Sequence, residues 1–485
     1  MSRTRRGAPS ARNQNPNLHL VDNDQLFRDL IEFVLPDGAL FTKGEFHGNI
    51  KWVPEQLTAQ ALIWAWQDSK NVTDAFVKTL EVCKRIHLAK VATTYTGFIN
   101  VVSRHRDFIA GRLRDRYQEL AEEIGGRFYR TGSWVLIGFD GSRATAPRTV
   151  ANEKAFCAPN YGQSRKAKYG KKKSKGHRRK RNKEQKTEPQ EPQVWVTMMC
   201  HLGLRLPWTW RLGPSNSSER GHVQEMLEQE DFPEKTLFIG DAGFVGYPLW
   251  RSVIDSGQDF LIRVGANVNL LSDHANIKVL GGGIVLCWPK DKIAEGQPPL
   301  KLRLVQVRVG KTKMWMLTSV LDRKELTNKE IVRYYKMRWG LELEFRGLKQ
   351  TIDKHKLRSR NSDRLLAELD WALRGMAIAE LLALRQQIKA KDKQKTYTPD
   401  DRSLANTLRV LRTCMRTLGS KVAPKDHLLK QLANATIQRY DNRTDKRARY
   451  RPKNPDIKPL GDPVVRSLTA EERKQLRIFH STNTL

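Results

Sequence analysis

The sequence predicts an α/β protein in which a mixed sheet lies between two helical regions. Two continuous apolar runs each end in an acidic residue, 134–139 before Asp140 and 237–239 before Asp241, as buried central strands do. Residues 22–125 instead repeat apolar side chains at spacings of three and four, which indicates helices. The alternation of strand and helix patterns after Asp140 favours an α/β core over an all-helical one.

The chain of 485 residues has room for two to four domains. We expect the following parts: a disordered basic tail, 1–17; a helical domain, 18–126; an α/β core, 127–361, containing a mobile basic loop, 145–193, and a β-rich insertion, 265–312; and a helical C-terminal region that serves oligomerisation, 362–485.

The charge of the chain indicates a polyanionic partner. Lys and Arg number 87 against 52 Asp and Glu, a formal charge of +35. Double-stranded DNA is the expected partner. An anionic membrane surface is the alternative, but the basic runs lack the aromatic and Leu faces of an interfacial helix.

Hydropathy and cysteine content restrict the cellular compartment of the protein. No apolar run approaches the ~18 residues that span a bilayer, and no apolar segment follows the N-terminal arginines, so we expect neither signal peptide nor membrane anchor. The five cysteines are far apart and odd in number, which fits a reducing compartment and gives no zinc-ligand spacing. We expect a cytoplasmic protein.

Two segments are candidates for contacting DNA. Residues 89–108 predict two short helices around Arg104, His105 and Arg106, as in a helix-turn-helix; an ordinary bundle with solvated arginines is the alternative. Residues 165–186 hold thirteen Lys or Arg and cannot pack a core. We interpret this run as a phosphate clamp, with a solubility tail or a localisation-like patch as alternatives. Its candidate DNA-binding residues are Lys171, Lys172, Lys173, Arg178, Arg179, Lys180 and Arg181.

Residues 327–350 predict a single helix that begins at a capping box of Thr327 and Glu330. At about 100° per residue, a stripe within roughly 60° on this helix collects four polar residues. They are Tyr335, Arg338, Glu342 and Lys349. Glu344 falls roughly opposite Tyr335, so the geometry favours Glu342. A surface helix on which Glu342 pairs with Arg346 is the alternative.

Three carboxylates, Asp140, Asp241 and Glu342, follow strands that end at one edge of the expected sheet, where ligands bind in open α/β folds. Each Asp-Gly-type step taken alone is typical of a turn. Together, like charges need a cation, and Mg²⁺ prefers carboxylate oxygens. Two such ions support phosphodiester cleavage and transfer.

The spacing Tyr335, two residues, Arg338, three residues, Glu342, six residues, Lys349 resembles the YREK signature of insertion-sequence family four transposases. The segments RWGLELEFRGLKQ and LFIGDAGF are also similar to that family, over about residues 130–360. The family is a branch of the DDE transposases with an RNase H-like core. The resemblance implies metal binding by Asp140, Asp241 and Glu342.

The resemblance further implies phosphate contacts near the transposon end by Tyr335, Arg338 and Lys349; Arg346 is added as a DNA-binding candidate. A β-rich insertion at 265–312 is a family trait. Some relatives stack a flipped base on a tryptophan near it. Trp288 and Trp315 are candidates, with core packing as the alternative.

The expected function is that of a DNA transposase. It binds the terminal inverted repeats of its element, cleaves there with two Mg²⁺ ions, for which Mn²⁺ substitutes, and joins the 3′-hydroxyl ends to a target, within a homodimer or larger synaptic complex. The alternatives are a metal-dependent nuclease that does not join and a non-catalytic DNA-binding protein. No phosphate-binding G-x-x-x-x-G-K-[ST] loop is present, so no nucleotide cofactor is expected.

Overall fold

The computed structural model describes residues 20–42, 45–47, 49–157, 191–273, 277, 280–310, 312–391, 397–437 and 460–482. The expected tail, 1–17, and the lysines and arginines of the basic run, 165–186, lie outside these residues.

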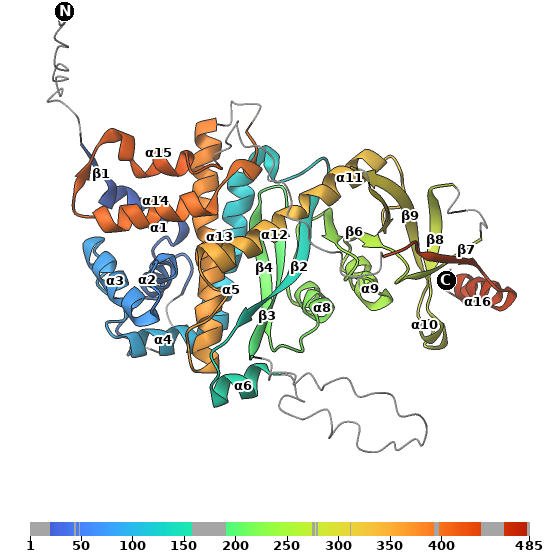
Figure 1. The fold of residues 1–485 in the computed structure, drawn as a ribbon, viewed down its shortest axis with the longest axis horizontal. Helices are drawn as coiled ribbons and strands as arrows, with labels where there is room; N and C mark the ends of the chain where they lie inside the picture. The colour runs from blue at the N-terminus through green and yellow to red at the C-terminus, as the bar shows by residue number, and fades with distance from the viewer. Residues whose placement is uncertain are drawn as a thin grey trace, which may run out of the picture.

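A ten-stranded mixed sheet forms the centre of the molecule (Figure 1). Its strand order is β12-β7-β8-β9-β10-β6-β5-β2-β3-β4. β2, β3 and β4 form an antiparallel meander, whereas β5 and β6 run parallel to β2 on its other side. This arrangement confirms the predicted α/β, RNase H-like mixed-sheet core. The five strands are Val135–Thr145, Gln193–His201, Leu206–Gly213, Thr236–Gly240 and Asp259–Val264.

The first of these strands is longer than expected. β2 does not end before Asp140 but runs on to Thr145. Its pairing with β5 stops at Gly138, whereas its pairing with β3 continues to Thr145. Asp140 therefore lies just beyond the parallel half of the sheet, inside a strand whose polar end pairs with β3 and, at Thr145 only, with the segment around Lys356.

Two helices cover the sheet next to the site. α8 (Glu219–Gln229) packs on β2, β3 and β4, and α9 (Tyr247–Asp255) packs on β6. α8 begins with Ser218 as its cap, which accepts from the N–H of Gly221.

The expected insertion is rich in strands but does not form a separate sheet. β9 pairs with β10, and β10 pairs with β6, so these strands extend the central sheet. The elements of this region are β7 (Asn269–Ser272), β8 (Gly282–Cys287), α10 (Lys290–Ala294), β9 (Leu300–Val309) and β10 (Thr312–Thr318).

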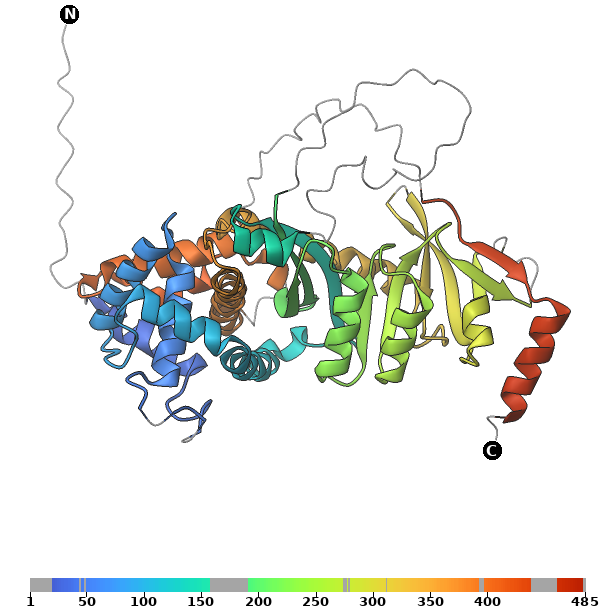
Figure 2. The same cartoon turned by 90° about the horizontal axis from the view of Figure 1, so that it is seen from below.

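The expected N-terminal helices are present. They pack against a long helix from the C-terminal part of the chain, α13 (Ser362–Lys391) (Figures 1 and 2). They are α1 (Asn23–Val34), α2 (Pro54–Trp66), α3 (Val72–Arg85), α4 (Tyr95–Arg104) and α5 (Arg106–Gly125), followed by the short η1 (Gly126–Phe128) and, after β2, α6 (Val150–Phe156). A small pairing of β1 (Val21–Asp22) with β11 (Lys421–Val422) joins the N-terminal part to the C-terminal part.

The expected helix-turn-helix is not formed within residues 89–108. Only His105 separates α4 from α5, and α5 extends for 20 residues. A helix-turn-helix needs a turn of about three or four residues. This part of the chain instead has the bundle arrangement that stood as the alternative.

The C-terminal region contains a strand as well as helices, and some of its helices are packed inside the molecule. α14 (Leu404–Thr417) and α15 (Leu428–Ala433), with the short η3 (Pro399–Asp401) and η4 (Pro424–Asp426), pack near α13. β12 (Val464–Ser467) then adds a parallel strand beside β7, before α16 (Ala470–Thr482). α13 is buried along most of its length, so it is not available for the contact between copies expected of this region.

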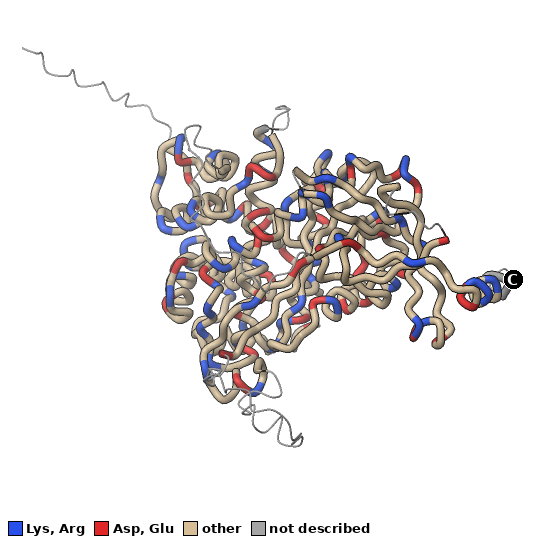
Figure 3. The backbone as a smooth tube through the Cα atoms, turned by 45° about the vertical axis from the view of Figure 1, so that its right-hand side comes forward, with Lys and Arg blue, Asp and Glu red and all other residues tan. Residues whose placement is uncertain are grey.

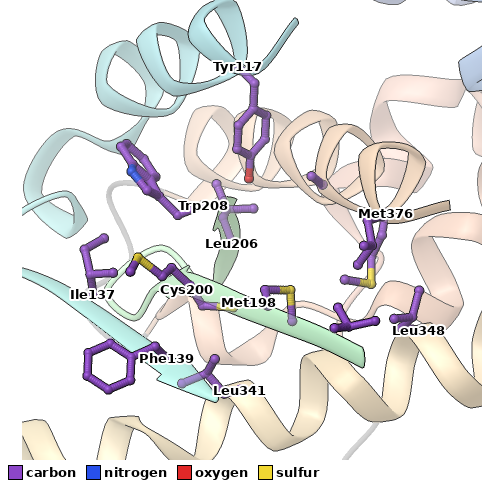
Figure 4. Close-up of a cluster of buried hydrophobic side chains, with 14 of the residues drawn as sticks. Tyr117, Ile137, Phe139, Met198, Cys200, Leu206, Trp208, Leu341, Leu348 and Met376 are labelled. Carbon is purple, nitrogen blue, oxygen red and sulfur yellow. The ribbon is translucent and has the colours of Figure 1, made fainter. Parts of the chain in front are cut away.

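One buried apolar cluster continues from the N-terminal helices through the sheet to α15. Figure 4 shows part of it, where β2 and β3 lie between α5, α13 and the helix that carries Leu341. The division of the chain at residues 17, 126 and 361 stays a prediction. Within the described residues, no helix is both long and apolar enough to cross a membrane.

Candidate active site

The stretch 327–350 is helical, but not as one regular α-helix. α11 (Asn328–Met337) begins at the predicted capping box, α12 (Trp339–Arg346) follows after Arg338, and η2 (Gly347–Thr351) is a π-helical turn. The backbone of Arg338 stays in the αR region, so the chain direction continues. Lys349 lies in the π turn, where the regular angle of about 100° per residue no longer applies.

Close packing brings α12 onto β2. Leu341 is fully buried and lies beside Phe139 of β2 (Figure 4). A Cβ added to Gly138 would lie 2.6 Å from Cδ1 of Leu341, so only glycine lets the two elements approach this closely. This contact sets Glu342, the next residue of α12, beside Asp140.

Arg338 connects these two carboxylates. Its Nη2 donates a hydrogen bond to Oε1 of Glu342 over 3.3 Å, and its Nη1 lies 3.7 Å from Oδ2 of Asp140. Glu342 therefore pairs with Arg338, and not with Arg346 as the alternative interpretation of the helix had it. The Arg346 side chain is exposed.

Asp241 follows β5 directly, and its Oδ1 accepts a hydrogen bond of 2.8 Å from the N–H of Gly243. Burial raises the pKa of Asp140, and the charges of Asp241 and Glu342 raise it further. The Gly141 N–H and the Arg338 guanidinium oppose this rise. The three predicted carboxylates thus lie within electrostatic reach of one another.

The three carboxylates do not converge as closely as a preformed metal site would require. Across the part of the chain that the structure describes, no three His, Cys, Asp or Glu side chains are gathered so that they could hold a metal ion. The Arg338 guanidinium lies between two of the expected ligands. The prediction that Asp140, Asp241 and Glu342 bind metal ions together therefore stays a prediction.

A fourth carboxylate, Glu219, adjoins the trio and was not predicted. It is the first residue of α8, and a Cβ added to Gly141 would lie 2.6 Å from its Cδ. Burial raises the pKa of Glu219, and the charges of Asp140 and Asp241 raise it further, while Arg143 lowers it. Its sequence context indicates only a helix start, because Ser218 is a common cap.

The remaining residues of the predicted stripe differ in exposure. Tyr335 is buried, with 8 % of its surface exposed, and its ring lies 5.7 Å from the Arg338 guanidinium. Lys349 is half-buried, which lowers its pKa. No ion-pair partner for Lys349 is found among the described residues. Trp339, which was not among the predicted site residues, follows Arg338 and is 54 % exposed.

Glu344 has a structural partner instead of a place beside Asp140. Its carboxylate, 4 % exposed, lies 3.2 Å from Nη2 of Arg205, and Nη1 of Arg205 lies 3.0 Å from Asp400. Burial, followed by the charge of Glu344, raises the pKa of Glu380 on α13 well above its usual range. This buried group anchors α12 to Arg205, beside the contact that Leu341 makes with β2.

Both tryptophans considered for base stacking belong to the core. Trp288 and Trp315 are buried. The indole N–H of Trp288 donates to the carbonyl of Gln297, and that of Trp315 donates to Oδ1 of Asp462, each over 2.8 Å. Core packing, the alternative interpretation, holds for both. The predicted phosphate clamp lies outside the described residues; its candidates were Lys171, Lys172, Lys173, Arg178, Arg179, Lys180 and Arg181.

Comparison with known proteins agrees with the geometry. Residues 139–378 match the family described as the transposase DDE domain. The chain is 27 % identical over 255 residues to the transposase InsG for insertion sequence element IS4 of Escherichia coli (strain K12), a match that covers 50 % of the chain and 55 % of that protein. The chain thus spans about half the length of this curated relative.

Among solved structures, the chain is similar to a piggyBac transposase in a synaptic complex with hairpin DNA. The TM-score is 0.34 at 12 % identity, over 88 % of this chain and 78 % of that one.

Proposed function

We propose that this chain, whose residues 139–378 match the transposase DDE domain, is a DDE transposase that cleaves DNA at the terminal inverted repeats of its own element and joins the 3′-hydroxyl ends to a target. The observation that carries this proposal is the grouping of Asp140, Asp241 and Glu342 around Arg338, since all three charges act on that guanidinium.

Divalent metal ions are general in this family, and the donor set here fits them. Asp140, Asp241 and Glu342 offer only carboxylate oxygens, the ligands of hard cations. Burial, and then the charges of Asp241 and Glu342, raise the pKa of Asp140, and nearby positive charge relieves this repulsion. We propose that these residues hold two Mg²⁺ ions and that Mn²⁺ substitutes. Bound ions of this kind activate the attacking hydroxyl and stabilise the leaving oxygen.

The other polar residues of the helical stretch hold the substrate. Lys349, half-buried and without an ion-pair partner among the described residues, offers its charge to a backbone phosphate. Arg338 and the exposed Arg346 supply further donors. The buried ring of Tyr335 supports the Arg338 guanidinium from one side.

Double-stranded DNA is the proposed partner for both steps, because the transposases that this chain resembles act on DNA. The formal charge of +35 fits a polyanion. We propose that residues 18–126 bind the inverted repeats, that the basic run 165–186 clamps phosphates, and that the active complex is a homodimer or a larger assembly. We propose that this takes place in the cytoplasm, at the nucleoid.

Replacing one carboxylate tests the chemistry. Asp140→Asn keeps the size of the side chain and removes its charge, so cleavage of a duplex bearing the element's ends with Mg²⁺ should fall more than the ~10–100-fold that loss of an outer-shell partner costs. DNA binding measured by gel shift should persist. The matched control is Asp115→Asn, which changes an exposed carboxylate on α5 and should cleave normally.

The same assay separates the alternatives. A pre-cut end supplied with a target plasmid should yield joined product. Cleavage without joining would identify a nuclease. Cleavage that is equal for the Asp140→Asn variant and the native chain would reject the proposed site, and absence of any cleavage by a DNA-binding native chain would favour a non-catalytic DNA-binding protein.

A further inference from the structure

One guanidinium lies between two carboxylates of the proposed site, and the charge of the third also acts on it. Arg338 lies 3.3 Å from Glu342 and 3.7 Å from Asp140, and its side chain is 14 % exposed. Burial lowers the pKa of Arg338. The charges of Tyr335, Asp140, Asp241 and Glu342 raise it, and the net effect is a rise. The guanidinium therefore supplies, beside these carboxylates, the positive charge that a metal ion would otherwise supply.

This position conflicts with metal binding. The guanidinium is engaged with Oδ2 of Asp140 and Oε1 of Glu342, oxygens that a divalent ion would need. Arg338 cannot yield by losing its proton, because arginine stays charged in proteins. A second cation beside it would meet a like charge at short range. Arg338 must move before the carboxylates can hold an ion.

A DNA phosphate is an alternative binding partner for the Arg338 guanidinium. Guanidinium groups bind phosphate through two parallel hydrogen bonds, a better match than the long contact to Asp140. The Nε of Arg338 is buried and has no hydrogen-bond partner, so the side chain has a donor to spare. The Tyr335 ring, 5.7 Å away, can support the guanidinium in either position.

We propose that Arg338 blocks metal binding in the DNA-free protein and releases the carboxylates when a DNA phosphate takes the guanidinium. This inference rests on the proposed function and deepens it. Binding of DNA and binding of metal then favour each other, and by linkage each raises the affinity for the other by the same factor. The protein would acquire its ions mainly on DNA, which restrains cleavage by the free chain.

The test measures Mn²⁺ binding to the full chain without DNA, with free Mn²⁺ counted by electron paramagnetic resonance. Arg338→Gln should bind Mn²⁺ about tenfold more tightly than the native chain, since one like charge and one competing donor group are lost. Arg338→Lys, which keeps a charge, should stay near the native affinity and guards against a folding defect. Lys336→Gln, an exposed cation on α11, is the matched control and should change nothing.

A second arm adds a mixed-sequence duplex at low salt. The native chain should then bind Mn²⁺ several-fold more tightly than without DNA, whereas Arg338→Gln should show little further gain, because its block is already removed. Unchanged or weaker Mn²⁺ binding by Arg338→Gln without DNA would overturn the inference. So would an equal gain from DNA in both chains.

Failure of this inference is distinguishable from failure of the proposed function. Asp140→Asn should lose Mn²⁺ affinity in every condition. If it does, and Arg338→Gln behaves as the native chain, the site stands and only the blocking role of Arg338 is rejected. If Asp140→Asn binds Mn²⁺ as well as the native chain, the metal site itself is rejected, and the inference falls with it.

Discussion

At the scale of single residues, the site depends on two glycines of β2. Gly138 lets Leu341 of α12 approach the strand, and Gly141 leaves room for the carboxyl group of Glu219. Asp140 lies between them and is thereby close to the carboxylates of Glu342 on α12 and Glu219 on α8. A side chain at either glycine would separate the elements that form the site.

Gly141→Ala tests this packing. The new Cβ would overlap the Glu219 side chain, which is flexible and half-buried and must turn away, so we expect a loss of about 1 kcal/mol in the free energy of unfolding, at the lower end of overpacking costs. Thermal or urea unfolding measures it. Gly111→Ala on α5 is the matched control; nothing lies within 4 Å of its added Cβ, and it should not destabilise the chain.

Combining Gly141→Ala with Glu219→Ala should recover most of the loss, because the double variant removes the overlapping group. Purely additive effects of the two substitutions would show that Glu219 does not occupy the space beside Gly141.

At the scale of elements, α12 is held by two different kinds of contact on its buried face. Leu341 packs on β2, while Glu344, three residues further along the helix, pairs with Arg205, the residue before β4. Arg205 also fits against Gly340, where an added Cβ would lie 2.8 Å from its Cδ. This double attachment fixes the rotation of the helix and hence the direction of Glu342.

Arg205→Met should destabilise the protein by about 3–5 kcal/mol, since it leaves the buried Glu344 carboxylate without its counterion. Urea unfolding gives the value. Lys235→Met is the matched control, because Lys235 makes an exposed pair with Glu325 over 3.9 Å, and it should cost no more than about 1 kcal/mol. Equal losses for both variants would contradict the structural role of the Arg205 pair.

At the scale of the whole molecule, one sheet and one continuous core connect the two ends of the chain. β12, near the C-terminus, pairs with β7 at one edge of the sheet, while α13 joins the N-terminal helices to the opposite side. In Figure 3, Lys and Arg positions are spread over the described chain among Asp and Glu positions. If a chain of formal charge +35 binds DNA as proposed, the binding should respond strongly to salt.

DNA affinity measured between 50 and 200 mM salt should fall by roughly 10³–10⁵-fold if about 6–10 phosphates are contacted. Lys349→Ala should weaken binding of all sequences alike and reduce the slope of log affinity against log salt by about one. Lys301→Ala, an exposed lysine on β9, is the control. An unchanged slope for Lys349→Ala would mean that Lys349 contacts no phosphate.

Local patterns were enough to predict much of this protein. Apolar runs located β5 and the first part of β2, and apolar spacing predicted the helices of the N-terminal part. The capping box set the start of α11, and the family resemblance rests on the spacing from Tyr335 to Lys349. These features depend on neighbours within about one helix turn or one strand, so they can be predicted from the sequence alone.

Only the tertiary structure decided how these pieces meet. The continuation of β2 past Asp140, the attachment of β12 to β7 and the burial of α13 each depend on partners far along the chain. The same is true of Glu219 beside Gly141 and of Arg338 between Asp140 and Glu342. Side-chain periodicity determines which face a residue occupies, whereas the group opposite that face is fixed by packing of the whole chain.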